Sequence, residues 1–218
     1  MEELKQLPGL PHLNIGSIFC IGRNYVAHAR ELDHDVPDQP MVFLKPVSSL
    51  TFEGPILLPP QSNEVHHEVE LVVAIEKGGK DISRAEALSH VGGYGVGIDL
   101  TARDIQSRAK KQGHPWSVAK GFDTFAPIST FIPGERVADP QNLGLSLAVN
   151  DRMRQQSNTR LMIFPVADLI HYLSTIFTLR RGDLIFTGTP EGVSPLRSGD
   201  HIEARLDETL AHLTMEVA

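Results

Sequence analysis

Residues 65–73 carry acidic side chains at alternate positions, and a strand would place these on a single face. In a strand the valines and the leucine of this segment would point into a core, whereas Glu68 and Glu70 would point to the opposite face. Their Cα atoms would then lie roughly 7 Å apart, close enough for both carboxylates to reach one cation. The alternative is an ordinary half-exposed strand with a solvated acidic face.

A third carboxylate, Asp99, lies within the short apolar run 96–100. An unpaired ionised carboxylate is costly in such surroundings, so Asp99 needs a cation, a cage of hydrogen bonds or a place at a strand end. It could instead stabilise the N-terminus of a helix that follows it. Three carboxylates from two strands form a hard oxygen site, which suits Mg²⁺ or Mn²⁺ better than Zn²⁺. Because Mg²⁺ usually keeps positions for water or substrate oxygens, such a site favours catalysis over a purely structural role.

His28 and Glu31 are three residues apart in a stretch, 25–32, that we expect to form a short helix, so their side chains share a face. A carboxylate beside an imidazole orients the ring and raises its basicity, as a general base requires. The other interpretation is an incidental contact on a surface helix.

Further polar residues follow in apolar or glycine-rich surroundings. Arg103 and Gln106 are three apart on a helix expected after the third carboxylate. Lys45 and Lys120 adjoin apolar and glycine or proline residues, which hints at partial burial, although a lone lysine is usually solvated.

The turn at 188–192 follows an apolar strand and contains Thr189. Such a turn can present backbone N–H groups and a hydroxyl to an anion. It is not a P-loop, because the Gly-Lys-Ser/Thr end is missing.

Strands are the elements that must position most of these side chains. Hydrophobic periodicity and turn residues predict strands at 15–21, 41–44, 65–75, 94–100, 145–149, 184–187 and 201–206, and helices at 25–32, 83–91, 101–112 and 165–177. Strands outnumber helices, and the two do not alternate regularly. The pattern therefore predicts a β-rich α+β fold rather than a doubly wound one.

The composition is that of an ordinary globular chain, with 218 residues of which 41% are hydrophobic and 22% charged. We expect an N-terminal arm over 1–14 and one catalytic domain over 15–218. The net charge of −7, with no basic run beyond Lys110-Lys111, argues against nucleic acid as a partner. No apolar stretch approaches the roughly 20 residues of a membrane span, and no signal peptide is evident. The single Cys20 fits a reducing compartment, so we expect a cytoplasmic location.

Several short motifs follow one another along the chain. They are Gly22-Arg23-Asn24-Tyr25 with His28 and Glu31, Phe43-Leu44-Lys45-Pro46, His66-His67-Glu68-Val69-Glu70-Leu71, Gly93-Tyr94, Asp99-Leu100-Thr101-Ala102-Arg103-Asp104 with Gln106, Ala119-Lys120, Phe122-Asp123, and Thr187-Gly188-Thr189-Pro190 with Gly192-Val193. Taken together, these motifs resemble the fumarylacetoacetate hydrolase family, in particular its small single-domain acylpyruvase, fumarylpyruvate hydrolase and oxaloacetate decarboxylase types. The resemblance runs from about Ile15 to the C-terminus, and Ser194 departs from it, because glycine is expected there.

This resemblance implies a mixed β-roll, a homodimer, and Mg²⁺ or Mn²⁺ held by Glu68, Glu70 and Asp99. It implies that Lys120 contacts the metal-bound substrate, and that His28 and Glu31 form a mobile pair that activates water. The substrate-contacting positions that it implies are Arg23, Arg103, Gln106 and Thr189.

The reaction that the resemblance implies is hydrolysis of a C–C bond in a small 2-oxo acid. The substrate would be an acylpyruvate or fumarylpyruvate, as in aromatic catabolism, and the metal would polarise its 2-oxo group. The leaving pyruvate enolate would be stabilised by the metal and Lys120. The same enolate serves the alternatives, which are decarboxylation or tautomerisation of oxaloacetate and isomerisation or decarboxylation of 2-hydroxyhepta-2,4-diene-1,7-dioate. The motifs do not separate these reactions, although the presence of both His28 and Glu31 favours hydrolysis. A non-catalytic module that binds a structural cation would leave that pair unexplained.

Overall fold

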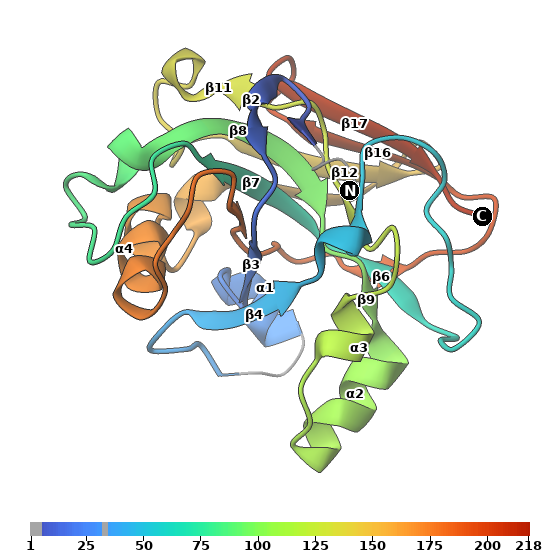
Figure 1. The fold of residues 1–218 in the computed structure, drawn as a ribbon. Coiled ribbons are helices and arrows are strands. Elements are labelled where there is room, and N and C mark those ends of the chain that lie inside the picture. Colours follow the sequence, from blue (N-terminus) through green and yellow to red (C-terminus); the bar gives the residue numbers. More distant parts are fainter. Residues whose placement is uncertain (1–5, 32–34) are drawn as a thin grey trace, which may run out of the picture.

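The computed structural model describes residues 6–31 and 35–218, which form a strand-rich α+β fold with several sheets and few helices (Figure 1). The predicted β-rich α+β class is confirmed. Within the described residues, no helix is long and apolar enough to cross a membrane.

A mixed six-stranded sheet forms the centre of the molecule, and β7 lies in its interior. Its strands, in spatial order, are β11 (Ile132–Pro133), β8 (Val91–Ile98), β7 (Val69–Ile75), β14 (Leu184–Phe186), β3 (Ile18–Gly22) and β4 (Met41–Lys45). Strands β14 and β3 run parallel, and the other pairs are antiparallel. Strand β7 is buried on both faces, with Leu71 and Val73 in the larger core and Val72 and Ala74 in a smaller one. The predicted alternation of this strand is therefore real, but neither face is solvated.

A second, antiparallel sheet packs on the first and closes the larger core. It consists of β13 (Arg152–Asn158), β12 (Gly144–Val149), β16 (His201–Leu206) and β17 (Ala211–Glu216). Strands β16 and β17 contact β8, and β12 contacts β7 (Figure 1). Ile202, Ala204 and Leu206 alternate into the core along β16, as predicted.

Three small sheets complete the strand content of the described residues. They are β1 (Gln6–Leu7) with β2 (Leu10–Asn14), β10 (Ala126–Pro127) with β5 (Leu50–Thr51), and β15 (Ser194–Pro195) with β6 (Val65–His67) and β9 (Thr101–Ala102). The β1–β2 hairpin buries Leu7, Leu10 and Leu13 in the smaller core. The division into an arm and a domain at residue 14 stays a prediction.

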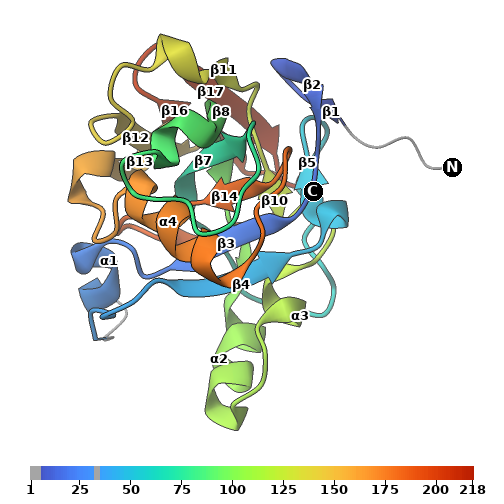
Figure 2. The same ribbon diagram turned by 60° about the vertical axis from the view of Figure 1, so that its left-hand side comes forward.

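The α-helices are short and lie around the sheets. They are α1 (Val26–Glu31), α2 (Arg103–Gln112), α3 (Ser117–Lys120) and α4 (Val166–Ile176), and the 3₁₀ turns are η1 (Val47–Ser49), η2 (Ala87–His90), η3 (Gly134–Arg136) and η4 (Thr159–Leu161). Helix α4 lies within the helix predicted at 165–177, and it buries Val166, Leu169, Ile170 and Leu173. Helices α2 and α3 project together from one end of the molecule (Figure 2).

Several predicted boundaries differ from the observed ones. The helix expected at 83–91 is only the turn η2, because the chain must enter β8 at Val91, and the Ser83 hydroxyl bonds the Glu86 side chain instead of capping a helix. The strand expected at 65–75 is interrupted at Glu68, where β6 and β7 join different sheets. The helix expected at 25–32 is observed as α1, and residue 32 lies outside the described residues.

Candidate metal centre

The three carboxylates predicted as a cation site lie together in the interior. Glu68 separates β6 from β7, Glu70 belongs to β7, and Asp99 follows β8. Pairing of β7 with β8 continues past the strand ends, where the Asp99 N–H donates to the Glu68 carbonyl at 2.8 Å. One oxygen from each of the three buried carboxylates lies within 4.8 Å of the others. The strand register thus brings together the side chains that the sequence placed on two strands.

Glu68 and Asp99 are matched by basic side chains. Glu68 accepts from Arg103 at 2.5 Å and from Lys120 at 2.8 Å, and Asp99 accepts from Lys120 at 2.5 Å. Burial raises the pKa of Glu68, but the charges of Lys120 and Arg103 hold it well below its usual value. For the Lys120 ammonium the directions are reversed. Burial lowers its pKa, but the negative charges of Asp99 and Glu68 outweigh burial and raise the pKa above its usual value. Glu68 and Lys120 are therefore both ionised at neutral pH.

Glu70 is the carboxylate that lacks such compensation. Its side chain accepts the Gly188 N–H at 2.7 Å, and within the described part of the chain no lysine, arginine or histidine forms an ion pair with it. Burial, and then the charge of Asp99, raises its pKa well above its usual value. A carboxylate buried beside other acidic side chains is ionised only when a positive partner compensates it. The oxygen donors and this shortage of positive charge at Glu70 fit a divalent cation.

A second lysine, Lys45, belongs to the cluster although the sequence only hinted at its burial. It ends β4, and its ammonium lies 2.8 Å from Oδ1 of Asp99. The same ammonium donates to the carbonyls of Leu100 at 3.1 Å and Phe125 at 2.9 Å, and also to that of Lys120. Lys45 therefore holds three chain segments against the cluster as well as contributing charge.

His28 and Glu31 form the pair that their spacing predicted. His28 is buried on α1, and its Nδ1 lies 3.2 Å from a Glu31 carboxylate oxygen. The other Glu31 oxygen accepts the Gly192 N–H at 3.0 Å, which ties α1 to the turn at 188–192. Burial lowers the pKa of His28, and this outweighs the opposing influence of Glu68 and Glu31. A neutral ring that donates from Nδ1 to Glu31 keeps Nε2 as a proton acceptor.

Every predicted site residue except Glu31 lines one small cavity with a volume of about 30 Å³. These residues are Arg23, His28, Glu68, Glu70, Asp99, Arg103, Gln106, Lys120 and Thr189. The structure shows that they meet, whereas their individual roles remain predictions. The sequence assigned no role to the other lining residues, although two of them belong to its motifs; they are Ile21, Gly22, Phe43, Lys110 and Trp116.

The basic residues at the cavity continue beyond the carboxylates. Arg103 donates to the buried Gln106 side chain at 2.9 Å, which fixes both on the first turn of α2. The Lys110 ammonium lies 5.3 Å from the centre of the Trp116 ring, and burial, followed by the charges of nearby arginines, lowers its pKa to about 8. Arg23 adopts a left-handed backbone with φ of 58°, a costly conformation that is frequent at functional sites. The cavity therefore suits an anionic ligand.

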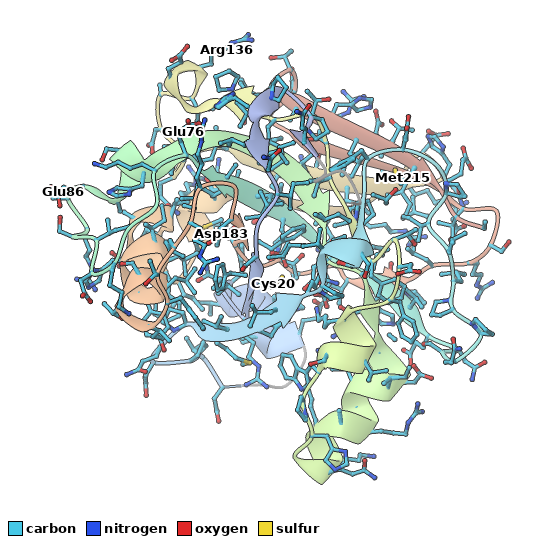
Figure 3. All side chains as sticks on the ribbon, viewed as in Figure 1. Cys20, Glu76, Glu86, Arg136, Asp183 and Met215 are labelled. Atoms are coloured by element: carbon cyan, nitrogen blue, oxygen red, sulfur yellow. The ribbon has the colours of Figure 1, made fainter. Side chains whose placement is uncertain are left out.

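Cys20 lies on β3 in the interior of the molecule (Figure 3). Burial, and then the charge of Asp99, raises the pKa of its thiol well above the usual value. The thiol is therefore unreactive at neutral pH.

Comparison with known proteins gives consistent matches along the chain. The model of the fumarylacetoacetate (FAA) hydrolase C-terminal family matches residues 17–218. The chain is 48% identical over 188 residues to the mitochondrial oxaloacetate decarboxylase of Dictyostelium discoideum, covering 85% of this chain and 86% of the relative. It is 44% identical over 196 residues to the mitochondrial oxaloacetate tautomerase FAHD1 of Bos taurus, covering 89% of each. The solved fumarylpyruvate hydrolase of Pseudomonas aeruginosa, in complex with Mn²⁺ and pyruvate, matches with a TM-score of 0.91 and 40% identity, covering 94% of this chain and 91% of that one.

Proposed function

The chain belongs to the fumarylacetoacetate hydrolase family, and on that premise we propose that it is a metal-dependent oxaloacetate tautomerase. The observation that carries this proposal is that a neutral, buried His28 and the three carboxylates line the same small cavity. A base beside a cation site is what the interconversion of keto and enol forms of a 2-oxo acid requires. Relatives named oxaloacetate tautomerase and oxaloacetate decarboxylase support this choice of substrate.

The basic side chains at the cavity support an anionic substrate. Arg23 and Lys110 line the cavity beside Arg103 and Lys120. A dicarboxylate such as oxaloacetate offers these side chains two negative groups. Glu68, Glu70 and Asp99 would hold Mg²⁺ or Mn²⁺, which when bound supplies Lewis-acid polarisation of the 2-oxo group.

The basic residues bind and orient the substrate in this proposal. The Arg103 guanidinium and the Gln106 amide are fixed against each other and would bind the C1 carboxylate. The Lys120 ammonium lies between Glu68 and Asp99, where it stabilises the negative charge that develops on the C2 oxygen when C3 loses a proton.

His28 carries the proton. Its Nδ1–H donates to Glu31, so Nε2 accepts the proton from C3 of the keto form and returns it to the C2 oxygen to give the enol. The reverse transfers convert the enol into the ketone. The lowered pKa keeps His28 in the neutral form that accepts the proton at neutral pH.

Hydrolysis of acylpyruvate or fumarylpyruvate, the main reaction predicted from the sequence, becomes the second candidate. The likeness to a fumarylpyruvate hydrolase favours it, as does the ability of the His28–Glu31 pair to deprotonate water. Decarboxylation of oxaloacetate needs the same stabilisation of charge on the C2 oxygen but no base at C3. A role in aromatic catabolism would follow only if the protein hydrolyses acylpyruvate or fumarylpyruvate.

One assay panel separates these candidates. The protein is given enol-oxaloacetate, keto-oxaloacetate, fumarylpyruvate and acetylpyruvate with Mg²⁺ or Mn²⁺, and each spontaneous rate is subtracted. We expect tautomerisation to have the highest kcat/KM. A higher kcat/KM for cleavage of fumarylpyruvate or acetylpyruvate would replace the proposal by the hydrolase, and release of CO₂ faster than tautomerisation would replace it by the decarboxylase.

We propose that the protein is a homodimer, on the strength of its family membership. We also propose a cytoplasmic location, although several relatives are named as mitochondrial. Fractionation of the source cells tests the location, and the oligomeric state is tested by its mass in solution.

A further inference from the structure

Gln155 is buried in an otherwise exposed strand. It lies in β13, the edge strand of the second sheet, and only 1% of its surface is accessible. Its neighbours Arg154 and Gln156 are both exposed. The Gln155 amide reaches inward to the start of β7 and the turn at 188–190, both of which adjoin the carboxylate cluster. A polar side chain buried in this way must find partners, and the partners show what it holds together.

The amide of Gln155 uses all of its hydrogen-bonding groups. Its Oε1 accepts the Val69 N–H at 3.0 Å. Its Nε2 donates to the Thr189 hydroxyl at 2.9 Å and to the Pro190 carbonyl at 2.9 Å. The Thr189 hydroxyl in turn donates to the Val69 carbonyl at 2.8 Å. Gln155 and Thr189 together therefore fasten the turn to both backbone groups of Val69.

Two further side chains fix the orientation of the amide. Nδ1 of His67 lies 2.9 Å from Oε1 of Gln155, and because Oε1 can only accept, this nitrogen carries the hydrogen. Nε2 of His67 then accepts from the Ser194 hydroxyl at 2.8 Å. Ser194 is the position at which the sequence departs from the glycine expected in the family, and its half-buried hydroxyl completes this chain of hydrogen bonds.

The fastened turn delivers a backbone group to the carboxylate cluster. Gly188 has φ of +100°, and a Cβ there would lie 2.6 Å from Asn24, so this position requires glycine. In this conformation its N–H points at Glu70 and donates to it at 2.7 Å. Among the hydrogen bonds of the described residues, this is the one that the Glu70 side chain accepts. Groups that orient a metal ligand from behind usually matter nearly as much as the ligand itself.

We propose that Gln155 is a positioning residue for the metal centre, which holds the 188–190 turn on β7 so that the Gly188 N–H orients Glu70. The proposal rests on the proposed metal-dependent function. It assigns a role in the site to a residue of the second sheet that does not line the cavity.

The test compares Gln155→Leu and Gln155→Glu with Gln156→Leu, which changes the same residue type on the exposed face of the same strand. Leu removes every hydrogen bond of the amide. Glu keeps the acceptor for Val69 and His67 but loses the donor to Thr189 and Pro190. If the leucine variant fails to fold, the Gln155→Glu variant alone tests whether Gln155 positions the metal centre. Three quantities are measured well below the melting temperature: the Kd for Mn²⁺ by calorimetry on metal-free protein, hydrogen exchange of the Gly188 amide by NMR, and Tm.

We expect both Gln155 variants to bind Mn²⁺ about tenfold more weakly and to exchange the Gly188 amide about tenfold faster, with Gln156→Leu matching the unmodified protein. Gln155 variants that lose only Tm, while the Mn²⁺ Kd and the Gly188 exchange rate stay unchanged, would overturn the proposal, because Gln155 would then serve the fold alone. Failure of the unmodified protein to bind Mn²⁺ or to turn over oxaloacetate would instead count against the proposed function. In that case the Gly188 exchange rate still decides whether Gln155 holds the turn.

Discussion

A histidine accepts a proton only when it is neutral and its free nitrogen faces the reacting atom. Both conditions depend on the environment of His28, which is buried and donates from Nδ1 to Glu31. The i, i+3 spacing was enough to predict the pair, because both side chains come from one turn of one helix. What spacing could not show is that Glu31 also accepts the Gly192 N–H, a contact between residues 161 positions apart.

Replacement of His28 by alanine should separate the candidate reactions. Loss of a general base typically costs on the order of 10²–10⁴ in rate, so His28→Ala should lose tautomerisation, and any hydrolysis, by that factor. Decarboxylation of oxaloacetate needs no base at C3 and should be largely retained. Steady-state kcat for each reaction at saturating Mn²⁺ is the measurement, with His114→Ala, an exposed histidine of the same chain, as the control. Equal losses in all three reactions would show that His28 acts in closing the cavity and not in proton transfer.

The pH profile should reflect the burial of His28. Its pKa is lowered from the ordinary value of 6.5, so protonation, which removes the base, occurs only at more acidic pH. We therefore expect kcat/KM of the Mn²⁺-loaded enzyme to stay level as the pH falls through 6.5 and to decline below it. An acidic limb with its midpoint above 6.5 would mean that the base is not a buried, neutral histidine.

At the scale of elements, sequence patterns predicted those strands and helices whose two faces differ in polarity. Strand β16 and helix α4 alternate polar and apolar residues, and both were found where the periodicity placed them. Strand β13 was not predicted, because it is a polar edge strand with Gln155 as its fully buried residue. The break at Glu68 was also missed, since β6 leaves the central sheet to pair with β15 and β9, and this depends on partners distant in sequence.

Lys45 joins several of these elements, and its loss should destabilise the fold. Its ammonium links β4 to the carbonyls of Leu100, Lys120 and Phe125 as well as to Asp99. Removing the ammonium takes a buried donor away from Oδ1 of Asp99 and from three carbonyls, so Lys45→Met should lower the free energy of unfolding by about 3 kcal/mol. Urea unfolding of metal-free protein measures this, with the exposed Lys111→Met as the control. Equal stability of the two variants would show that water or other groups satisfy these carbonyls.

At the scale of the whole molecule, the site was more predictable than the fold around it. The carboxylates, the His28–Glu31 pair and Lys120 lie in short motifs, so a resemblance carried by those motifs located them. Lys110, Trp116 and Gln155 reach the site or its support only through the packing of elements far apart in sequence, and no local pattern encodes that. This is why the sequence predicted which side chains meet at the centre but not the outer wall of its cavity.

The association state is a property of the whole molecule that family membership predicts. We expect sedimentation equilibrium at micromolar protein to give a mass near twice the 24.0 kDa of one chain. A mass near that of a single chain, unchanged as the protein is concentrated, would contradict the proposed homodimer.

We expect turnover to depend on a divalent cation held by Glu68, Glu70 and Asp99. The most direct measurement is the rate of oxaloacetate tautomerisation by protein stripped of metal and then titrated with Mn²⁺, for the unmodified chain and for Glu70→Gln, which keeps the shape of the side chain but not its charge. We expect no rate above the uncatalysed one before addition of Mn²⁺, saturable recovery in the unmodified protein, and no recovery over the same concentrations in Glu70→Gln. Full activity of protein that elemental analysis shows to be metal-free would contradict the dependence of turnover on a cation.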